Sequence, residues 1–422
     1  MKILVKQAVI ADPGSPYHGQ VTDILINGEQ ISKIAPNITD TADEIIDAAG
    51  ALVSQGWVDI FAHFCDPGYE YKETLETGAA AAAAGGFTRV FVLPNTLPVV
   101  DSKSQVEYIC QKSRSLPVTI QPLGAITRGT EGKDLAEMYD MKQSGAAAFS
   151  DGILPVQSPG LFVKALQYVK AFDGTLVQVP LDKSIGAGGL INEGVISTRL
   201  GLPGIPALAE EVIIKRDIDL LRYTQSRLHI TGVSTRNGMR FIEAAKKEGL
   251  DISCSVTPYH LFFCDEDMQS YDTNLKVNPP LRTREDMLAL REAVVNGVVD
   301  CIASHHIPQD WDNKTCEFEY AKNGMTGLET SFAVVNHLLP ELPADQLVRL
   351  FSLQARSLFH LPATPIKEGA AAELTIFSRS AQTLLLRTQL KTKSANTPFL
   401  ERELNGKVLG IVHKGKLTIN QN

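Results

Sequence analysis

Eight short apolar segments, each followed by a more polar stretch with helical character, are the feature that most constrains how this chain can fold. The predicted strands lie at residues 52–64, 88–95, 118–126, 146–151, 175–180, 227–233, 251–258 and 299–306. Eight strand–helix alternations in one run predict a (β/α)8 barrel. The alternative is a doubly wound open sheet. No GxGxxG motif opens a helix after the first strand, so a dinucleotide-binding version of that sheet has no support.

Both ends of the chain have a different sequence pattern. They contain short runs typical of β-strands, and Asn27-Gly28 and Asn405-Gly406 are typical of hairpin turns. We therefore expect residues 1–51 and 365–422 to build one small β domain together. Residues 52–364 would then form the barrel as an insert between its two halves.

Composition narrows the classes of partner. Forty Lys and Arg residues against 48 Asp and Glu residues give a net charge of −8, and the acidic residues are scattered. This balance predicts neither nucleic-acid nor membrane binding and favours small molecules or proteins as partners. Six cysteines without a CxxC pair, and a first segment without a long apolar core, predict a reduced, cytoplasmic protein.

The C-terminal ends of barrel strands are where the chemistry of such folds takes place. Here these ends carry His63, Asn95, Asp151, His260 and His305. Imidazoles and carboxylates at strand ends are what a metal-dependent barrel hydrolase needs to hold a cation that activates water. The strand ends therefore carry such imidazoles and carboxylates, but only a few of them.

Several long motifs resemble one known family nearly end to end. They are DPGYEYKETLETGAAAAAAGGFT, VLPNTLPV, GAAAFSDGILPV, INEGVISTRLGLPGIPALAEE, VTPYHL, KVNPPLR, GMTGLET and KSANTPFLERELNGKV. With these motifs the chain resembles the dihydroorotases of the cyclic amidohydrolase family. The resemblance implies a metal-binding (β/α)8 barrel with a small β-sandwich domain made from both termini.

The same resemblance implies that most positions of the family's chemistry are altered. Phe61, Val179 and Gly232 stand where the family has histidines. Cys65 replaces the Arg that clamps the substrate carboxylate, and His305 replaces the catalytic Asp. A catalytic zinc usually has three protein ligands, and a general base contributes roughly 10²–10⁴ in rate. We therefore expect hydrocarbon from Phe61 and Val179 to fill part of the former metal pocket.

Each remaining candidate has a functional and a structural interpretation. His63, Asp151 and His305 could form a new mononuclear metal site, or His63 could be a hydrogen-bonded pocket residue and Asp151 the acceptor of a turn. Asn95 and Asn278 match substrate-contacting positions of the family, but both lie in turn-forming motifs. Cys65 beside His63 is a Cys–His pair that could act as a nucleophile, although nothing else in the chain indicates covalent chemistry.

Two hypotheses follow. The first is a dihydroorotase homologue that has lost catalysis, needs no cofactor and serves as a structural or regulatory subunit. The resemblance implies aspartate transcarbamoylase as its partner, and we expect a homo-oligomer. The second is an active cyclic amidohydrolase that uses one zinc ion on His63, Asp151 and His305. A conventional dihydroorotase ranks lowest, because both the ligand set and the base are missing.

Overall fold

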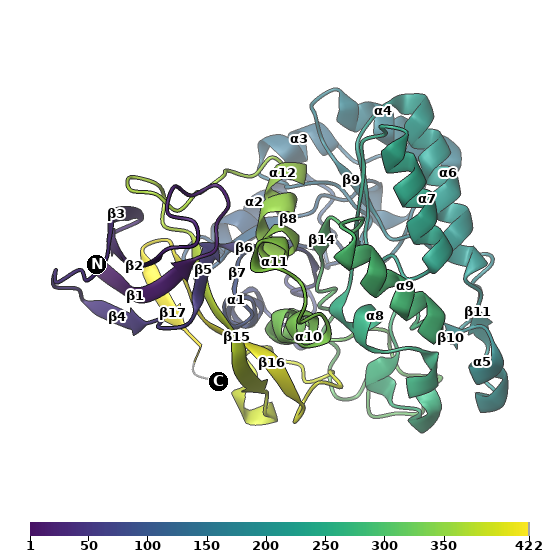
Figure 1. The fold of residues 1–422 in the computed structure, drawn as a ribbon. Helices are drawn as coiled ribbons and strands as arrows, with labels where there is room; N and C mark the ends of the chain where they lie inside the picture. The colour runs from purple at the N-terminus through teal and green to yellow at the C-terminus, as the bar shows by residue number, and fades with distance from the viewer. Residues whose placement is uncertain (421–422) are drawn as a thin grey trace.

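The computed structural model describes residues 1–420 and contains a closed barrel of eight parallel strand positions (Figure 1). Seven of them are β6 (Trp57–Ala62), β7 (Phe87–Val92), β8 (Thr119–Pro122), β9 (Leu176–Gln178), β12 (Leu228–Ile230), β13 (Ile252–Val256) and β14 (Cys301–Ile302). The eighth is supplied by Phe149, which bridges Gly124 after β8 and Leu176 in β9. A parallel bridge between Ala62 and His306 closes the ring. The predicted barrel is confirmed, and closure excludes the open sheet.

Helices alternate with these strands, as the sequence pattern predicts. They are α1 (Leu75–Ala84), α2 (Lys103–Lys112), α3 (Met138–Gln143), α4 (Pro159–Lys170), α6 (Leu208–Thr224), α7 (Arg236–Lys247), α8 (Pro258–Phe262), α9 (Arg284–Val295), α10 (Ser331–Leu338), α11 (Ala344–Val348), η5 (Arg349–Leu353) and α12 (Gln354–Leu358). The loops add β10 (Ile191–Asn192), α5 (Val195–Leu200), β11 (Gly204–Ile205), η1 (Arg128–Thr130), η2 (Asp265–Ser270), η3 (Thr273–Leu275), η4 (Leu328–Thr330) and η6 (Arg387–Gln389).

Helix α1 shows how local sequence fits this packing. It begins at Thr74, whose hydroxyl accepts a hydrogen bond from the Thr77 backbone while the Thr77 hydroxyl accepts one from the Thr74 backbone. Its alanine run is largely buried. A Cβ atom at Gly78 would come within 2.5 Å of the Phe64 ring. Small side chains therefore let this helix lie close against the end of β6.

The two termini build one domain, in which purple and yellow strands lie side by side (Figure 1). Its strands are β1 (Lys2–Ile10), β2 (Val21–Asn27), β3 (Gln30–Ala35), β4 (Glu44–Asp47), β5 (Leu52–Gln55), β15 (Leu374–Leu384), β16 (Glu403–His413) and β17 (Lys416–Ile419). The hydrogen-bonded order is β17-β16-β15-β5-β1-β2-β3, with β4 also on β1. One apolar cluster joins side chains of β1, β2, β3, β5, β15 and β16.

The expected boundary between residues 51 and 52 is four residues too early. The apolar run at 52–64 holds two strands, because β5 pairs with β1 and β15 in the terminal sheet and only β6 enters the barrel. Gly56 separates them, and a Cβ atom there would come within 2.2 Å of the Thr88 hydroxyl. Close approach of β7 therefore requires glycine at this corner.

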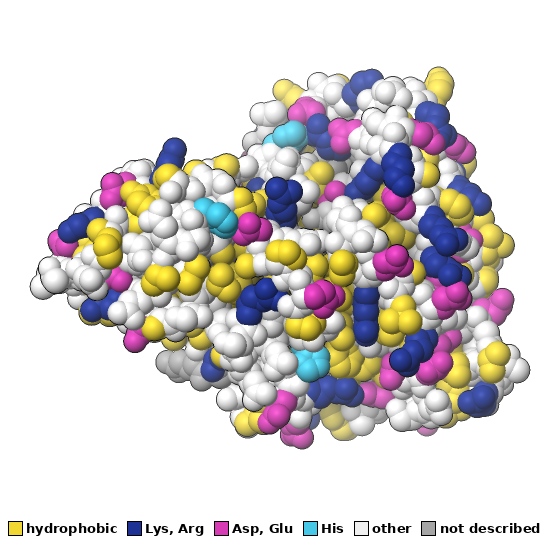
Figure 2. Space-filling view, viewed as in Figure 1, with side chains coloured by type: hydrophobic (Ala, Val, Ile, Leu, Met, Phe, Trp, Pro, Cys, Tyr) yellow, Lys and Arg dark blue, Asp and Glu magenta, His cyan; other side chains and the backbone are white. Residues whose placement is uncertain are grey.

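No helix within residues 1–420 has the length and apolar character needed to cross a membrane. On the face shown in Figure 2, Lys and Arg side chains are interspersed with Asp and Glu side chains over the barrel helices.

A buried ion network joins the two domains at Glu373, just before β15. Its carboxylate accepts hydrogen bonds from Arg89 of β7 at 2.8 and 3.0 Å and from Arg356 of α12 at 2.5 Å. Burial opposes ionisation of Glu373, but Arg356 and Arg89 overcome it and lower the pKa of this carboxyl to about 2. The network thus ties β15 to the barrel.

We predict that Glu373→Gln lowers the free energy of unfolding by about 3–5 kcal/mol, because two buried guanidinium groups lose their counter-charge. Denaturant unfolding measures the change, and Glu292→Gln on the exposed face of α9 is the matched control. The folded pKa of Glu373 lies below its unfolded value. The stabilisation is therefore complete above about pH 4.5 and is lost as the pH falls toward 2. An equal loss in both variants would contradict this account.

Candidate functional site

Closure of the barrel brings the ends of β6 and β14 together. The backbone N–H and the hydroxyl of Ser304 donate to the Asp59 carboxylate at 2.6 and 2.8 Å, and the His63 N–H donates to the His306 carbonyl at 2.8 Å. Burial raises the pKa of Asp59 to about 6, against the effect of the Ser304 hydrogen bonds. Phe61 on one strand end thereby faces His305 on the other.

An aromatic stack stands at this junction. The rings of Phe61 and His305 are both buried, with centroids 4.2 Å apart and an interplanar angle of 27°. Val179 is buried in the same apolar cluster as Phe61. Gly232 has φ +71°, and a Cβ atom there would come within 2.5 Å of His305 Cε1. The imidazole of His305 thus occupies the space that any side chain at position 232 would need.

A ladder of hydrogen bonds inside the barrel sets the protonation of His305. The Ser255 hydroxyl donates to the Thr231 hydroxyl at 2.8 Å, so it accepts from His229 Nε2 at 3.0 Å. His229 Nδ1 then accepts from Ser253 at 2.8 Å. The hydroxyl proton of Thr231 remains to be donated to His305 Nε2, 2.8 Å away.

This pattern places the proton of neutral His305 on Nδ1. Nδ1 is buried and has no hydrogen-bond partner within residues 1–420. Burial, with smaller effects of His260 and His229, lowers the pKa of His305 well below its usual value. Neither ring nitrogen therefore has a free lone pair for a metal ion or a proton.

His63, unlike His305, has hydrogen-bond partners at both ring nitrogens. Its Nδ1 accepts from the Cys65 N–H at 2.8 Å, so Nε2 carries the proton and donates to the Asn95 carbonyl at 3.0 Å. Burial lowers the pKa of His63 to about 4. Cys65 makes this contact from a left-handed backbone conformation with φ 59°. In this arrangement His63 pins the loop after β6 instead of offering a ligand atom.

The Asp151 carboxylate faces a loop. Oδ1 accepts from the backbone N–H groups of Ile126 and Thr127, both at 2.9 Å, and Oδ2 accepts from the Thr127 hydroxyl at 2.5 Å. Burial raises the pKa of Asp151 to about 6, although these hydrogen bonds oppose the shift. Asp151 thus acts as the acceptor for the turn that follows β8.

None of the other predicted site residues is arranged for catalysis: Asn95 bonds to the backbone, the Asn278 oxygen has no partner within residues 1–420, and Cys65 is held as a thiol. Asn95 Nδ2 donates to the Asp151 carbonyl at 3.0 Å, and its Oδ1 accepts from the Ile153 N–H at 3.1 Å. Asn278 precedes a cis proline, and its buried Oδ1 has no partner among the described residues. Burial raises the pKa of the Cys65 thiol, which disfavours the thiolate that a nucleophile would need.

The residues present do not fit a zinc ion. Within residues 1–420 no group of three or more His, Cys, Asp or Glu side chains is placed to hold a metal ion. The expected set of His63, Asp151 and His305 does not converge, because each side chain is committed to a different neighbour. What remains at the barrel mouth is a cavity of about 360 Å³ lined by His63, Cys65, Lys72, Asn95, Ile153 and Gln309, among others.

Sequence reasoning missed two features of this mouth. The ladder residues His229 and Thr231, and Ser253 and Ser255, are each two positions apart, and this spacing alone places them on one face of a strand. Lys72 brings the positive charge of the mouth cavity, and its Nζ lies 5.6 Å from the ring centroids of Tyr69 and Tyr71. No pattern in the sequence distinguishes it from other surface lysines.

Comparison with known proteins identifies the family. The model of the Dihydro-orotase-like family matches residues 50–238. The dihydroorotase of Syntrophus aciditrophicus is 38% identical over 426 residues, spanning 100% of both chains. That of Pelotomaculum thermopropionicum is 39% identical over 411 residues, spanning 96% of both. The chain belongs to the dihydroorotase family.

Solved structures of other proteins share the fold of this chain. The L-hydantoinase (dihydropyrimidinase) of Arthrobacter aurescens superposes with a TM-score of 0.87 at 23% identity, covering 99% of this chain and 96% of that one. The dihydropyrimidinase of Brevibacillus agri gives 0.83 at 19% identity, covering 99% and 95%. At this identity the likeness shows a shared fold, and the barrel with its terminal β domain is confirmed.

We predict that Gly232→Ala lowers the free energy of unfolding by about 2–5 kcal/mol, combining left-handed backbone strain with overpacking against His305. In a His305→Ala background only the backbone strain of about 1–2 kcal/mol remains. Denaturant unfolding of the four proteins in this double-mutant cycle yields the coupling energy.

Gly201→Ala is the matched control for the cycle. Gly201 also has a left-handed conformation, with φ +67°, but a Cβ atom there meets nothing within 4 Å. Its substitution should cost the same with or without the His305 ring. If Gly232→Ala is equally independent of His305, the packing described for this pair is wrong.

Proposed function

We propose that this member of the dihydroorotase family does not hydrolyse dihydroorotate and serves as a structural or regulatory subunit. The observation that carries the proposal is the stack of Phe61 on His305 at the strand ends where the resemblance expects a metal ligand and the catalytic base. At these strand ends lie the Phe61 ring and the neutral imidazole of His305, whose Nδ1 carries a proton and so has no lone pair to offer. The scaffold around these rings is intact.

A hydrolase of this kind needs metal ligands, a general base and a group that binds the substrate carboxylate, and each of the three is affected. At three positions where the resemblance implies metal-ligating histidines the chain has Phe61, Val179 and Gly232, none of which has a donor atom in its side chain. A neutral, buried His305 cannot accept the proton of an attacking water at neutral pH. Cys65 cannot clamp a carboxylate bidentately as arginine does. Because these contributions multiply, we expect no measurable turnover.

The test is hydrolysis of dihydroorotate by protein reconstituted with Zn²⁺, together with its zinc content after dialysis. We predict less than about 0.1 zinc per chain and no turnover above the background without enzyme, because the ligand set is incomplete. The dihydroorotase of Syntrophus aciditrophicus is the positive control. Stoichiometric zinc with turnover would refute the proposal.

The alternative of an active amidohydrolase with one zinc on His63, Asp151 and His305 makes the opposite prediction for this experiment. It requires side-chain rearrangement at all three residues, since their ligand atoms are engaged elsewhere. If zinc and activity on any cyclic amide were found, loss of both in His305→Ala would identify that site.

For the partner, we propose aspartate transcarbamoylase, which catalyses the step before the family's own reaction, and a homo-oligomer of this chain within the complex. We predict that analytical ultracentrifugation of the mixed proteins at about 10 µM shows a species heavier than either protein alone. Serum albumin in place of the transcarbamoylase is the control. Separate sedimentation of the two proteins at this concentration would contradict the partner assignment.

A further inference from the structure

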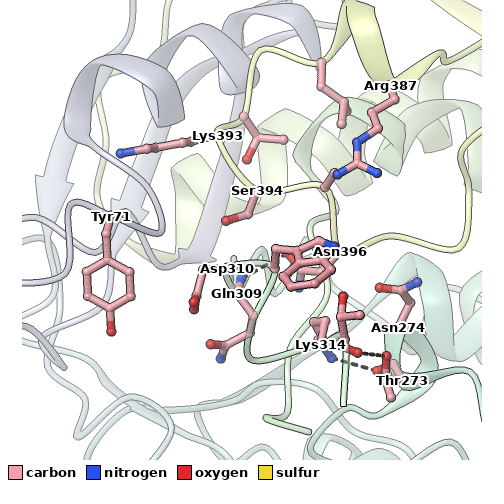
Figure 3. A pocket seen from close by; sticks show the side chains of 15 residues that line it. Tyr71, Thr273, Asn274, Gln309, Asp310, Lys314, Arg387, Lys393, Ser394 and Asn396 are labelled. Carbon is pink, nitrogen blue, oxygen red and sulfur yellow. Dashed lines mark hydrogen bonds between the residues drawn. The ribbon is translucent and has the colours of Figure 1, made fainter.

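A second cavity lies beside the barrel mouth and belongs to no part of the site above. Its volume is about 540 Å³, larger than the mouth cavity, and it lies between residues 273–274, 309–315 and 387–396 (Figure 3). Gln309 lines both cavities. The remaining residues that line the second cavity play no role in the proposed function.

One buried lysine, Lys314, lines the cavity, and a second, Lys276, lies behind it close enough to affect its charge. Lys314 Nζ donates to the Thr273 carbonyl at 2.7 Å, and Lys276 Nζ donates to the carbonyls of Phe318 and Glu319 at 2.6 and 2.9 Å. No carboxylate of residues 1–420 lies within 4.0 Å of either ammonium group. Burial, and the positive charge of Lys276, lower the pKa of Lys314 to about 7. Lys314 therefore carries its full positive charge only below about pH 7, and no carboxylate of the described residues balances that charge.

Polar groups on the walls lack partners. Within the described part of the chain, the Arg387 guanidinium and the Asn274 side-chain amide make no hydrogen bond or ion pair, and Gln309 Oε1 is buried and unpaired. The lining has one acidic residue, Asp310, and three basic residues, which are Arg387, Lys314 and Lys393. In the view of Figure 3, Arg387 and Asn274 lie on one side of the cavity, and Asp310 lies on the other.

An exposed indole completes the lining. Trp311 is 65% exposed, whereas the other tryptophan, Trp57, is in the core at 1%. The Trp311 carbonyl accepts hydrogen bonds from the N–H groups of Lys314 and Thr315 at 3.0 and 2.8 Å, which orders the loop that presents the ring. A solvent-exposed indole on an ordered loop offers a flat stacking surface for another ring system.

We propose that this cavity binds a planar nitrogen heterocycle that carries a phosphate or carboxylate group. The ring stacks on Trp311, and the anion pairs with the Arg387 guanidinium, which can bind either group through two hydrogen bonds. The Asn274 side-chain amide, which has both a donor and an acceptor group, can pair with the polar edge of the heterocycle. The mouth cavity lacks this combination.

Two matched ligand pairs test the proposal by isothermal titration calorimetry on the full chain. Uridine monophosphate against uridine examines the phosphate, and pyridine-3-carboxylate against its amide examines the carboxylate. We expect at least one anion to bind about tenfold or more tightly than its uncharged twin. Equal affinity within both pairs, or no binding of either anion at millimolar concentration, would overturn the proposal.

Two substitutions locate the site. Arg387→Gln should weaken binding of the anion about tenfold or more, whereas Arg114→Gln, at an exposed arginine outside the cavity, should not. The ligand should quench tryptophan fluorescence in the wild-type chain, and Trp311→Phe, which leaves only buried Trp57, should abolish the quenching. Unchanged affinity in Arg387→Gln, or quenching that persists in Trp311→Phe, would place the ligand elsewhere.

Discussion

The closure of the barrel between β6 and β14 is the interaction on which the rest of the structure depends. It is made by the Asp59 carboxylate, which holds both the N–H and the hydroxyl of Ser304, and by the backbone hydrogen bond from His63 to His306. These contacts fix the two strand ends at which Phe61 and His305 meet. Closure brings the two buried rings together, so the contacts that complete the barrel also fill the space at this junction.

The residues packed at this junction depend on one another. The ring of His305 fits only because position 232 has no Cβ atom, and it is held from one side by Phe61 and from another by the Thr231 hydroxyl. Any side chain introduced at position 232 would meet that ring. The unpaired Nδ1–H of His305 costs about 1–3 kcal/mol. Packing of the stack and of the surrounding apolar cluster offsets that cost.

Much of the fold could be predicted from the sequence, because apolar periodicity and turn residues report local structure directly. All eight strand positions of the barrel and the pairing of both termini follow from such patterns, although Phe149 forms only bridges and β5 crosses the expected boundary. The hydrocarbon at Phe61 and Val179 was also predictable. The side chains of the expected metal set point in different directions, which the sequence does not show: Asp151 faces the backbone of Ile126 and Thr127. The cavity at Trp311 and Arg387 is built from segments far apart in the chain, so no local pattern in the sequence could predict it.

The central claim concerns the side chains at the strand ends of this dihydroorotase homologue. Buried rings fill the space there, and His63, Asp151 and His305 are held by other neighbours, so that they cannot bind a metal ion together. The most direct test of this claim is a crystal structure of the chain grown with excess Zn²⁺, with anomalous data collected at the zinc edge. The account predicts a Phe61 ring stacked on His305 and no anomalous peak within about 2.5 Å of His63, Asp151 or His305. A strong peak bound by any two of these side chains, with the stack opened, would contradict it.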